Sequence, residues 1–142
     1  MQHQEPNLER ETPVALRGAA MSNDAFLRVI HSGTHEQLAV MTLPPDGETG
    51  PRVHVDADEL YVAVDGTAEA RVGDLVFAIL PGDVVFVEAG TAHNIVNRAV
   101  LPLRLVCVYA PPAVPAGTLF LTREEATFDE LGRPESSLRS QS

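Results

Sequence analysis

The chain has 142 residues, of which 44% are hydrophobic and 21% charged, a composition typical of one globular domain rather than of a disordered protein. Twenty Asp and Glu residues against ten Lys and Arg give a formal net charge of −10, which argues against nucleic acid and membrane surfaces as partners. The single cysteine excludes an internal disulfide, and no segment has transmembrane length or the pattern of a signal peptide. We therefore expect a cytoplasmic protein.

The chain is expected to have three parts. Residues 1–24 are polar and interrupted by Pro6 and Pro13, so we expect an N-terminal arm or a short helix. In residues 25–112, short runs rich in Val, Leu and Ile alternate with turn sequences such as PPDG and LPGD, a pattern typical of an antiparallel sandwich or barrel. Residues 113–142 are expected to form a C-terminal extension with a helical turn at EEATFDEL and about ten disordered residues at the end.

Two strands of the predicted barrel, residues 75–79 and 84–87, are apolar at every position. A strand with one wet face would alternate, so we expect one face in the core and the other covered by a second sheet or a partner subunit. For this reason we expect a homodimer. The turn sequences Asp65-Gly66 and Gly73-Asp74 predict β-hairpins of type I′ and type II′, respectively.

Residues that can bind a metal occur in two segments, PRVHVDADELYVAVDG (residues 51–66) and GDVVFVEAGTAHNIVN (residues 82–97). In the first segment, His54 ends one predicted strand and Glu59 begins the next, and in the second, His93 opens a strand. Imidazole nitrogens and a carboxylate oxygen together suit divalent Mn, Fe, Co, Ni, Cu or Zn. Adjacent strands of a barrel can direct such groups to one interior point.

The two segments resemble the paired motifs of the cupin superfamily, G-x5-H-x-H-x3,4-E-x6-G and G-x5-P-x-G-x2-H-x3-N. The second motif is matched by Gly82, Gly90, His93 and Asn97, with Glu88 in place of the proline. The first motif is matched by His54, Glu59 and Gly66, but Arg52 replaces its first histidine and Gly47 is one residue out of register with its opening glycine. Residues 33–38 and the YAPPAVPAGT ending also resemble a bacterial branch of small cupins described as mannose-6-phosphate isomerase-like.

The resemblance implies an all-β, single-domain cupin β-barrel, also called a double-stranded β-helix or jelly roll. It further implies a divalent transition metal held by His54, Glu59 and His93, and a small organic substrate that can be anionic. Two histidines and one carboxylate leave open positions for substrate and O₂, so we expect an oxygenase-type reaction in preference to an isomerisation.

Arg52 leaves two alternatives open. It can bind an anionic group of the substrate, with Tyr61 and His35 also lining the pocket, although Tyr61 equally suits the core. It can instead pair with Glu59 in a barrel without metal, which would make the protein a non-catalytic small-molecule-binding or sensor module. Metal-independent sugar epimerisation is a third candidate, whereas the motifs of nucleophilic hydrolases, nucleotide-binding loops and zinc knots are missing from the sequence.

Overall fold

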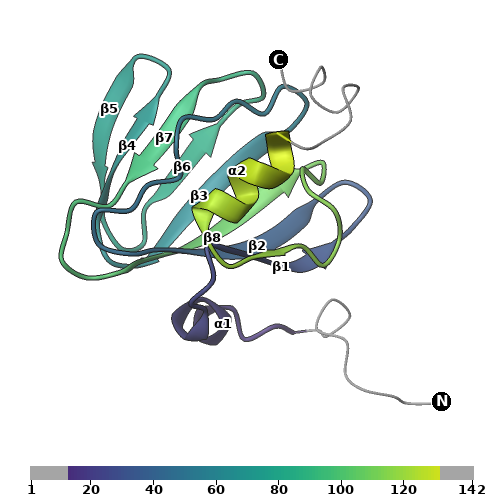
Figure 1. The fold of residues 1–142 in the computed structure, drawn as a ribbon, viewed down its shortest axis with the longest axis horizontal. Coiled ribbons are helices and arrows are strands. Elements are labelled where there is room, and N and C mark those ends of the chain that lie inside the picture. Colours follow the sequence, from purple (N-terminus) through teal and green to yellow (C-terminus); the bar gives the residue numbers. More distant parts are fainter. Residues whose placement is uncertain (1–12, 132–142) are drawn as a thin grey trace.

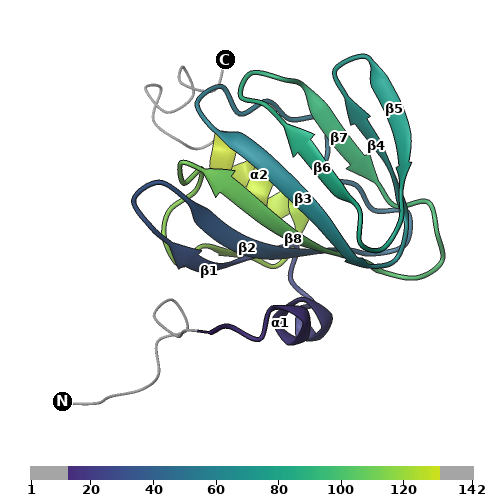
Figure 2. The ribbon, with the colours of Figure 1, turned by 180° about the vertical axis from the view of Figure 1, so that it is seen from behind.

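The computed structural model describes residues 13–131, with side chains over residues 13–127. Within this range the elements are α1 (Leu16–Ser22), β1 (Leu27–Ser32), β2 (Gln37–Leu43), β3 (Asp58–Asp65), β4 (Ala68–Val72), β5 (Leu75–Ile79), β6 (Val84–Val87), β7 (His93–Val96), β8 (Leu103–Ala110), β9 (Leu119–Phe120) and α2 (Arg123–Leu131). The strands form two antiparallel sheets, ordered β6-β3-β8-β2-β1-β9 and β5-β4-β7. Figures 1 and 2 show these sheets as the two layers of a flattened barrel, which confirms the predicted all-β jelly roll.

Alternating side chains along β3 and β7 build the interior of the barrel. Along β3, Glu59, Tyr61 and Ala63 are buried while their neighbours are more exposed, and along β7, His93 and Ile95 are buried in the same way. This period of two is that of a strand with one face in the core. Because Glu59 and His93 occupy positions of this inner face, both side chains are directed into the barrel.

The segment between β2 and β3 extends the smaller sheet beyond β7. The backbones of Arg52 and His93 exchange two hydrogen bonds of 2.9 Å, and the amide of Gly90 donates to the carbonyl of His54 at 2.9 Å. Asn97, which is fully buried, donates through its side chain to three carbonyl oxygens, those of Leu43, Pro44 and Leu101. These bonds hold the segment that carries His54 beside the strand that carries His93.

The C-terminal part of the described chain covers one end of the barrel (Figure 1). We call residues 113–126 the cap. Gln37, fully buried on β2, donates to the carbonyl of Val114 at 2.7 Å and accepts from the amides of Ala113 and Val114 at 3.0 and 3.2 Å. The amide of Glu125 donates to Thr122 Oγ1, which starts α2 as an N-cap and confirms the predicted helical turn.

The predicted hairpin at Gly73-Asp74 is confirmed, because β4 and β5 pair directly across it and Gly73 has a φ of 58°. The hairpin predicted at Asp65-Gly66 is wrong: β3 pairs with β6 and β8, whereas β4 pairs with β5 and β7. The chain crosses there from one sheet to the other. Gly66 permits the crossing, since its φ is 92° and a Cβ atom would lie 2.6 Å from the carbonyl oxygen of Pro102.

The structure describes only part of the predicted N-terminal arm and of the predicted C-terminal extension. α1 lies within the predicted N-terminal arm, and β9 and α2 lie within the predicted C-terminal extension. The first twelve residues of the arm and the predicted disordered end fall outside the described residues. In the described range, neither helix has the length and apolar character needed to cross a membrane.

Candidate metal centre

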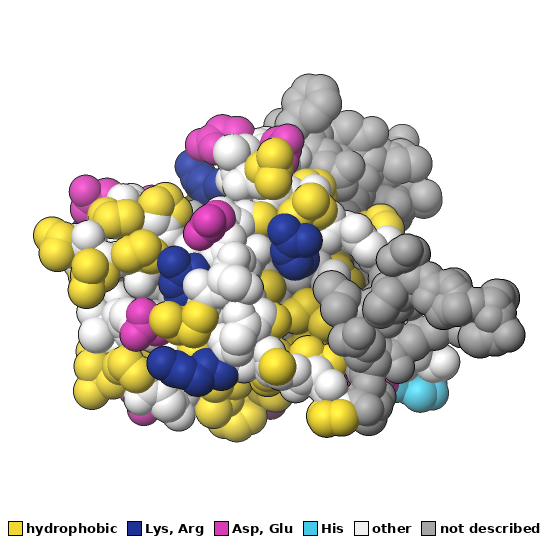
Figure 3. All heavy atoms as spheres, turned by 90° about the horizontal axis from the view of Figure 1, so that it is seen from below, with side chains coloured by type: hydrophobic (Ala, Val, Ile, Leu, Met, Phe, Trp, Pro, Cys, Tyr) yellow, Lys and Arg dark blue, Asp and Glu magenta, His cyan; other side chains and the backbone are white. Residues whose placement is uncertain are grey.

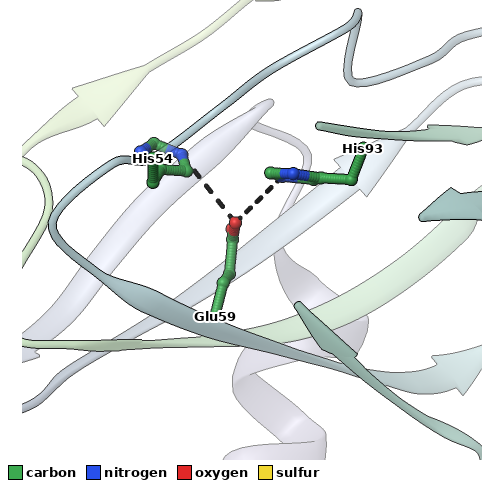
Figure 4. Close-up of side chains that lie close together, drawn as sticks. All are labelled: His54, Glu59 and His93. Carbon is green, nitrogen blue, oxygen red and sulfur yellow. Dashed lines mark ion pairs between the residues drawn. The ribbon is translucent and has the colours of Figure 1, made fainter. Parts of the chain in front are cut away.

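Three side chains from separate parts of the chain meet inside the barrel (Figure 4). His54 follows the segment beside β7, Glu59 lies near the start of β3, and His93 begins β7. His93 Nε2 lies 3.1 Å and His54 Nε2 3.8 Å from Glu59 Oε1. One ligand atom of each residue lies within 4.8 Å of those of the other two. The structure thus brings together the three residues that the motif spacing singles out.

The polar atoms at this point lack ordinary partners. Both carboxyl oxygens of Glu59 and Nε2 of His93 are buried without a hydrogen bond of good geometry, and the hydroxyls of Tyr61 and Tyr109 are the nearest hydrogen-bonding groups that act on Glu59. His93 Nδ1 lies 3.0 Å from the carbonyl oxygen of Thr91, which can only accept, so Nδ1 carries the hydrogen. With the hydrogen on Nδ1, a neutral ring directs the lone pair of Nε2 towards the carboxyl group of Glu59, whereas an imidazolium ring donates Nε2–H to it. Nε2 and the carboxylate oxygen lie 3.1 Å apart, an arrangement that either a proton on Nε2 or a metal ion between the two groups would stabilise.

The separations suit a metal ion of the first transition row. Imidazole nitrogens and carboxylate oxygens bind such ions at roughly 2.0–2.2 Å, so neighbouring ligand atoms on one ion lie on the order of 3 Å apart. The distances of 3.1 and 3.8 Å to Glu59 Oε1 are of this size. The carbonyl of Thr91 would orient the His93 ring from the second coordination shell. The donor set, its burial and its spacing therefore fit a bound metal.

Two tyrosines flank the three residues. The Tyr61 ring centroid lies 6.0 Å from that of His93, and the Tyr109 ring centroid lies 5.7 Å from that of His54. Burial, and after it the negative charge of Glu59, raises the pKa of both phenols well above the ordinary value. Both tyrosines therefore remain protonated over the physiological range and present neutral O–H groups to the site.

Tyr109 is a site residue that the sequence analysis missed. It lies directly opposite Glu59 in the antiparallel pairing of β3 with β8, 50 positions away in the chain. Only this strand pairing, which the motifs do not encode, brings it to the site. Cys107 lies opposite Tyr61 in the same pair of strands and is fully buried. Burial raises the pKa of its thiol, as is typical of an inert core cysteine.

Arg52 lines the same cavity as His54 and Glu59. Its Nε donates to the carbonyl of Thr49 at 2.9 Å, and its guanidinium carbon lies 5.5 Å from the centroid of the Phe26 ring. These contacts fix the direction of the side chain. Whether Arg52 binds a substrate anion or pairs with Glu59 therefore stays a prediction.

The cavity in front of this group is small and has two kinds of wall. Its volume is about 20 Å³, space for about one water molecule. Its polar wall is formed by Arg52, His54, Glu59, Tyr61 and Tyr109, and its apolar wall by Phe26, Leu27, Met41, Val114, Phe120 and Ala126. The last three belong to the cap. His35 lies in the turn between β1 and β2, is exposed, and is not part of the lining.

A larger hollow of about 510 Å³ lies elsewhere on the protein, between the loop of residues 44–48 and the start of α2. It contains none of the three converging residues, and its charged groups are of both signs, namely Asp24, Asp46, Glu48, Arg104, Arg123 and Glu124. His54 and Glu59 therefore line the small interior cavity and not the larger hollow.

Comparison with known proteins agrees with the fold and the motifs. The family model for the Cupin domain matches residues 39–109, and the chain belongs to this family. It is 29% identical over 123 residues to the uncharacterized protein YrkC of Bacillus subtilis (strain 168), a match that covers 82% of this chain and 66% of YrkC. Cupins typically bind a transition metal and commonly bind small molecules.

Solved structures show the same architecture. The crystal structure of BH2720 from Bacillus halodurans superposes with a TM-score of 0.81 at 26% identity, covering 84% of this chain and 95% of that one. TT1209 from Thermus thermophilus gives a TM-score of 0.61 at 26% identity, covering 69% and 95% of the two chains. The chain is therefore a single cupin domain, and assignment to the mannose-6-phosphate isomerase-like branch stays a prediction.

Proposed function

We propose that the protein binds one divalent transition metal through His54, Glu59 and His93 and acts on a small anionic organic molecule. The observation that carries this proposal is the set of buried atoms without a hydrogen bond of good geometry, the two oxygens of Glu59 and Nε2 of His93. A buried group of this kind costs about 1–3 kcal/mol when it is left unsatisfied, and more when it is charged. A cation at the point where the three side chains meet would remove this cost.

A metal held by two imidazoles and one carboxylate supplies Lewis acidity and open coordination positions for a substrate and O₂. For this reason we favour oxidation of the substrate by O₂ over isomerisation. The residues of the chain have separate tasks in this function. Thr91 fixes the tautomer of His93, and Glu59 provides the negative charge that a divalent ion requires. The phenols of Tyr61 and Tyr109, protonated because of their raised pKa, would donate hydrogen bonds to an oxygen atom of the substrate.

The anionic character of the substrate is inferred from Arg52. Two cations in one cavity repel each other unless an anion lies between them. Arg52 lines the cavity beside His54 and Glu59, and its contacts with Thr49 and Phe26 hold the guanidinium in place. A planar guanidinium matches the geometry of a carboxylate or a phosphate. Such a group would be bound by Arg52 on one side and by the metal on the other.

Access to this site depends on the cap. A cavity of about 20 Å³ does not admit an organic molecule, and Val114, Phe120 and Ala126 form the part of its wall that belongs to the cap. β9, within the cap, pairs with β1 through only two residues on each strand. We infer that the substrate enters when the cap moves away from the barrel and that the returning cap excludes water from the site.

The test is a titration of the chelator-treated protein with Mn²⁺, Fe²⁺ under argon, Co²⁺, Ni²⁺, Cu²⁺ and Zn²⁺, followed by elemental analysis after gel filtration. The wild type should retain one ion per chain. The variant His93→Ala should lose at least about 10–100-fold in affinity, because it removes one of three protein ligands. The control His35→Ala, which changes an exposed histidine outside the site, should bind as the wild type does.

Two results would overturn the proposal. Either a wild-type protein that retains none of these ions, or a His93→Ala variant with unchanged affinity, would exclude a metal at this position. The first result would favour the metal-free binding or sensor module in its place. A screen of small carboxylates and phosphates, with oxygen consumption as the readout, then tests the substrate class, and Arg52→Gln should raise KM for the active compound at least tenfold.

A further inference from the structure

The small interior cavity and the larger hollow are neighbours. Met41 and Phe120 line the small cavity, and the residues that follow them in the chain, Thr42 and Leu121, line the hollow. Phe26 lines both, and in the described part of the chain it is the one residue that the two linings share. The two cavities are therefore separated at Phe26.

The side chain of Phe26 is buried between groups that belong to both cavities. Phe26 is 4% exposed, and its ring centroid lies 5.5 Å from the guanidinium carbon of Arg52, which lines the small cavity. Its backbone amide donates a hydrogen bond of 3.1 Å to the carbonyl of Leu121 in the cap, and its carbonyl accepts one of 3.3 Å from the amide of Thr42. A different rotamer of Phe26 would move the ring without breaking these backbone bonds.

The two cavities differ in what they can hold. The small one, of about 20 Å³, has space for about one water molecule, whereas the hollow of about 510 Å³ lies within the roughly 300–1,000 Å³ of ligand pockets. An organic anion whose charged group reaches Arg52 has no room for its remaining atoms in the small cavity. The hollow supplies that room once the Phe26 ring has moved.

The charges of the hollow limit what these remaining atoms can be. Acidic and basic side chains are interspersed on the face of the protein that Figure 3 shows. In the hollow the acidic side chains outnumber the arginines, and one of the arginines, Arg104, donates from Nη1 to the carbonyl of Asn23 at 2.7 Å. A second negative charge on the bound molecule is therefore disfavoured there. Much of the wall is apolar and is formed by Phe26, Leu43, Pro44, Pro45, Pro102 and Leu121.

We propose that the hollow is the outer part of the substrate site and that Phe26 is the residue that opens it to the small cavity. The substrate is then an organic anion with its one negative group at Arg52 and an uncharged, largely apolar body in the hollow. This assignment of the substrate rests on the proposed function, whereas the opening at Phe26 does not depend on a bound metal. The cap movement inferred above acts at the same place, because residues 121–124 of the cap line the hollow.

The test uses the tyrosine fluorescence of the metal-free, full-length protein. The chain contains no Trp, and its only two tyrosines, Tyr61 and Tyr109, both line the small cavity. Quenching of this fluorescence by acrylamide therefore measures entry into the cavity. Phe26→Ala removes the ring between the cavities and should raise the quenching constant at least about fivefold over the wild type. The matched control Leu27→Ala changes an equally buried neighbour that lines only the small cavity, and it should be quenched as the wild type is.

A block at the hollow shows by which route acrylamide enters. Glu124 lines the hollow and is exposed, so Glu124→Cys can be coupled to a polyethylene glycol maleimide while Cys107 stays buried. In the Phe26→Ala background this label should remove most of the gain in quenching. The same label on Asp74→Cys, an exposed position outside the hollow, should leave the gain unchanged.

Hexanoate and adipate test the substrate class, because they have the same chain length but differ by one carboxylate. In calorimetry with and without Zn²⁺, hexanoate should bind at least about tenfold more tightly, since adipate places a second negative charge among the acidic side chains of the hollow. Adipate that binds as tightly as hexanoate would overturn the assignment of the substrate.

Circular dichroism establishes that each variant is folded. Phe26→Leu keeps more of the core filled than Phe26→Ala does and should raise the quenching constant in the same direction, which keeps the test valid where the alanine variant does not fold. Equal quenching of the folded Phe26 and Leu27 variants, or a label at position 124 without effect, would overturn the opening at Phe26, whatever the metal titration shows. A protein that binds no metal but shows the expected quenching would overturn only the proposed metal centre, so the two proposals fail separately.

Discussion

Replacement of Glu59 by glutamine should stabilise the protein in the presence of a chelator. The carboxyl oxygens of Glu59 and Nε2 of His93 are buried without a hydrogen bond of good geometry, and Oε1 lies 3.1 Å from Nε2. An amide N–H at the position of Oε1 can donate to the lone pair of Nε2. An unsatisfied buried group costs about 1–3 kcal/mol, so Glu59→Gln should raise the free energy of unfolding by about this amount. For a domain of this size the melting temperature should rise by roughly 3–10 °C.

In excess metal, the wild type should be more stable than the Glu59→Gln variant. A metal at 100 times its dissociation constant stabilises the folded wild type by about 2.7 kcal/mol. The glutamine variant lacks the anionic ligand and should gain much less. Thermal unfolding, followed by circular dichroism with EDTA and with added Zn²⁺ or Mn²⁺, measures both quantities. The control Glu88→Gln alters an exposed carboxylate and should change stability by less than about 0.5 kcal/mol in either buffer. A Glu59→Gln variant less stable than the wild type in EDTA, or with an equal gain from metal, would refute the reasoning.

Three further outcomes follow from other buried groups. Asn97→Ala removes three hydrogen bonds to carbonyl oxygens and should lower the free energy of unfolding by about 2–4 kcal/mol in urea titrations; a loss below about 1 kcal/mol would contradict the role given to this side chain. Gln37→Leu removes the bonds that hold the cap and should speed metal removal by EDTA at least tenfold, as measured by stopped flow, whereas an unchanged rate would show that the cap does not control access. The raised pKa values of Tyr61 and Tyr109, the only two tyrosines, mean that the folded state keeps protons that the unfolded state releases near pH 10, so the free energy of unfolding should fall as the pH rises above 10. Absorbance at 295 nm should then rise only with unfolding, and titration of either phenol near pH 10 in the folded protein would contradict its burial.

The sequence was sufficient for the fold and for the three converging residues because both leave local signals. Short apolar runs between turn sequences predict the strands, and Glu59 and His93 lie on inner faces near the starts of β3 and β7. These features depend on neighbours along the chain. They can therefore be predicted without knowing which strands pair. The strand predicted to end at His54 is wrong, because this residue lies in an irregular segment after the isolated bridge between Arg52 and His93.

The sequence does not predict the positions of residues that depend on contacts between segments distant in the chain. Tyr109 reaches the site because β8 lies beside β3, and Asp65-Gly66 fails to form a hairpin because β3 and β4 belong to different sheets. His35 was expected at the pocket, but the turn after β1 leaves it exposed. Gln37 shows the same limit, since its partners Ala113 and Val114 lie more than 70 positions further along the chain.

The most direct test of the proposed metal centre is X-ray absorption spectroscopy of the protein loaded with one equivalent of Zn²⁺. The account predicts a first shell of nitrogen and oxygen ligands at roughly 2.0–2.1 Å with the multiple-scattering pattern of two imidazole rings. The same spectrum of His93→Ala should show one imidazole. A wild-type shell of oxygen alone, or a pattern that is unchanged in the variant, would contradict the convergence of His54, Glu59 and His93 on one ion.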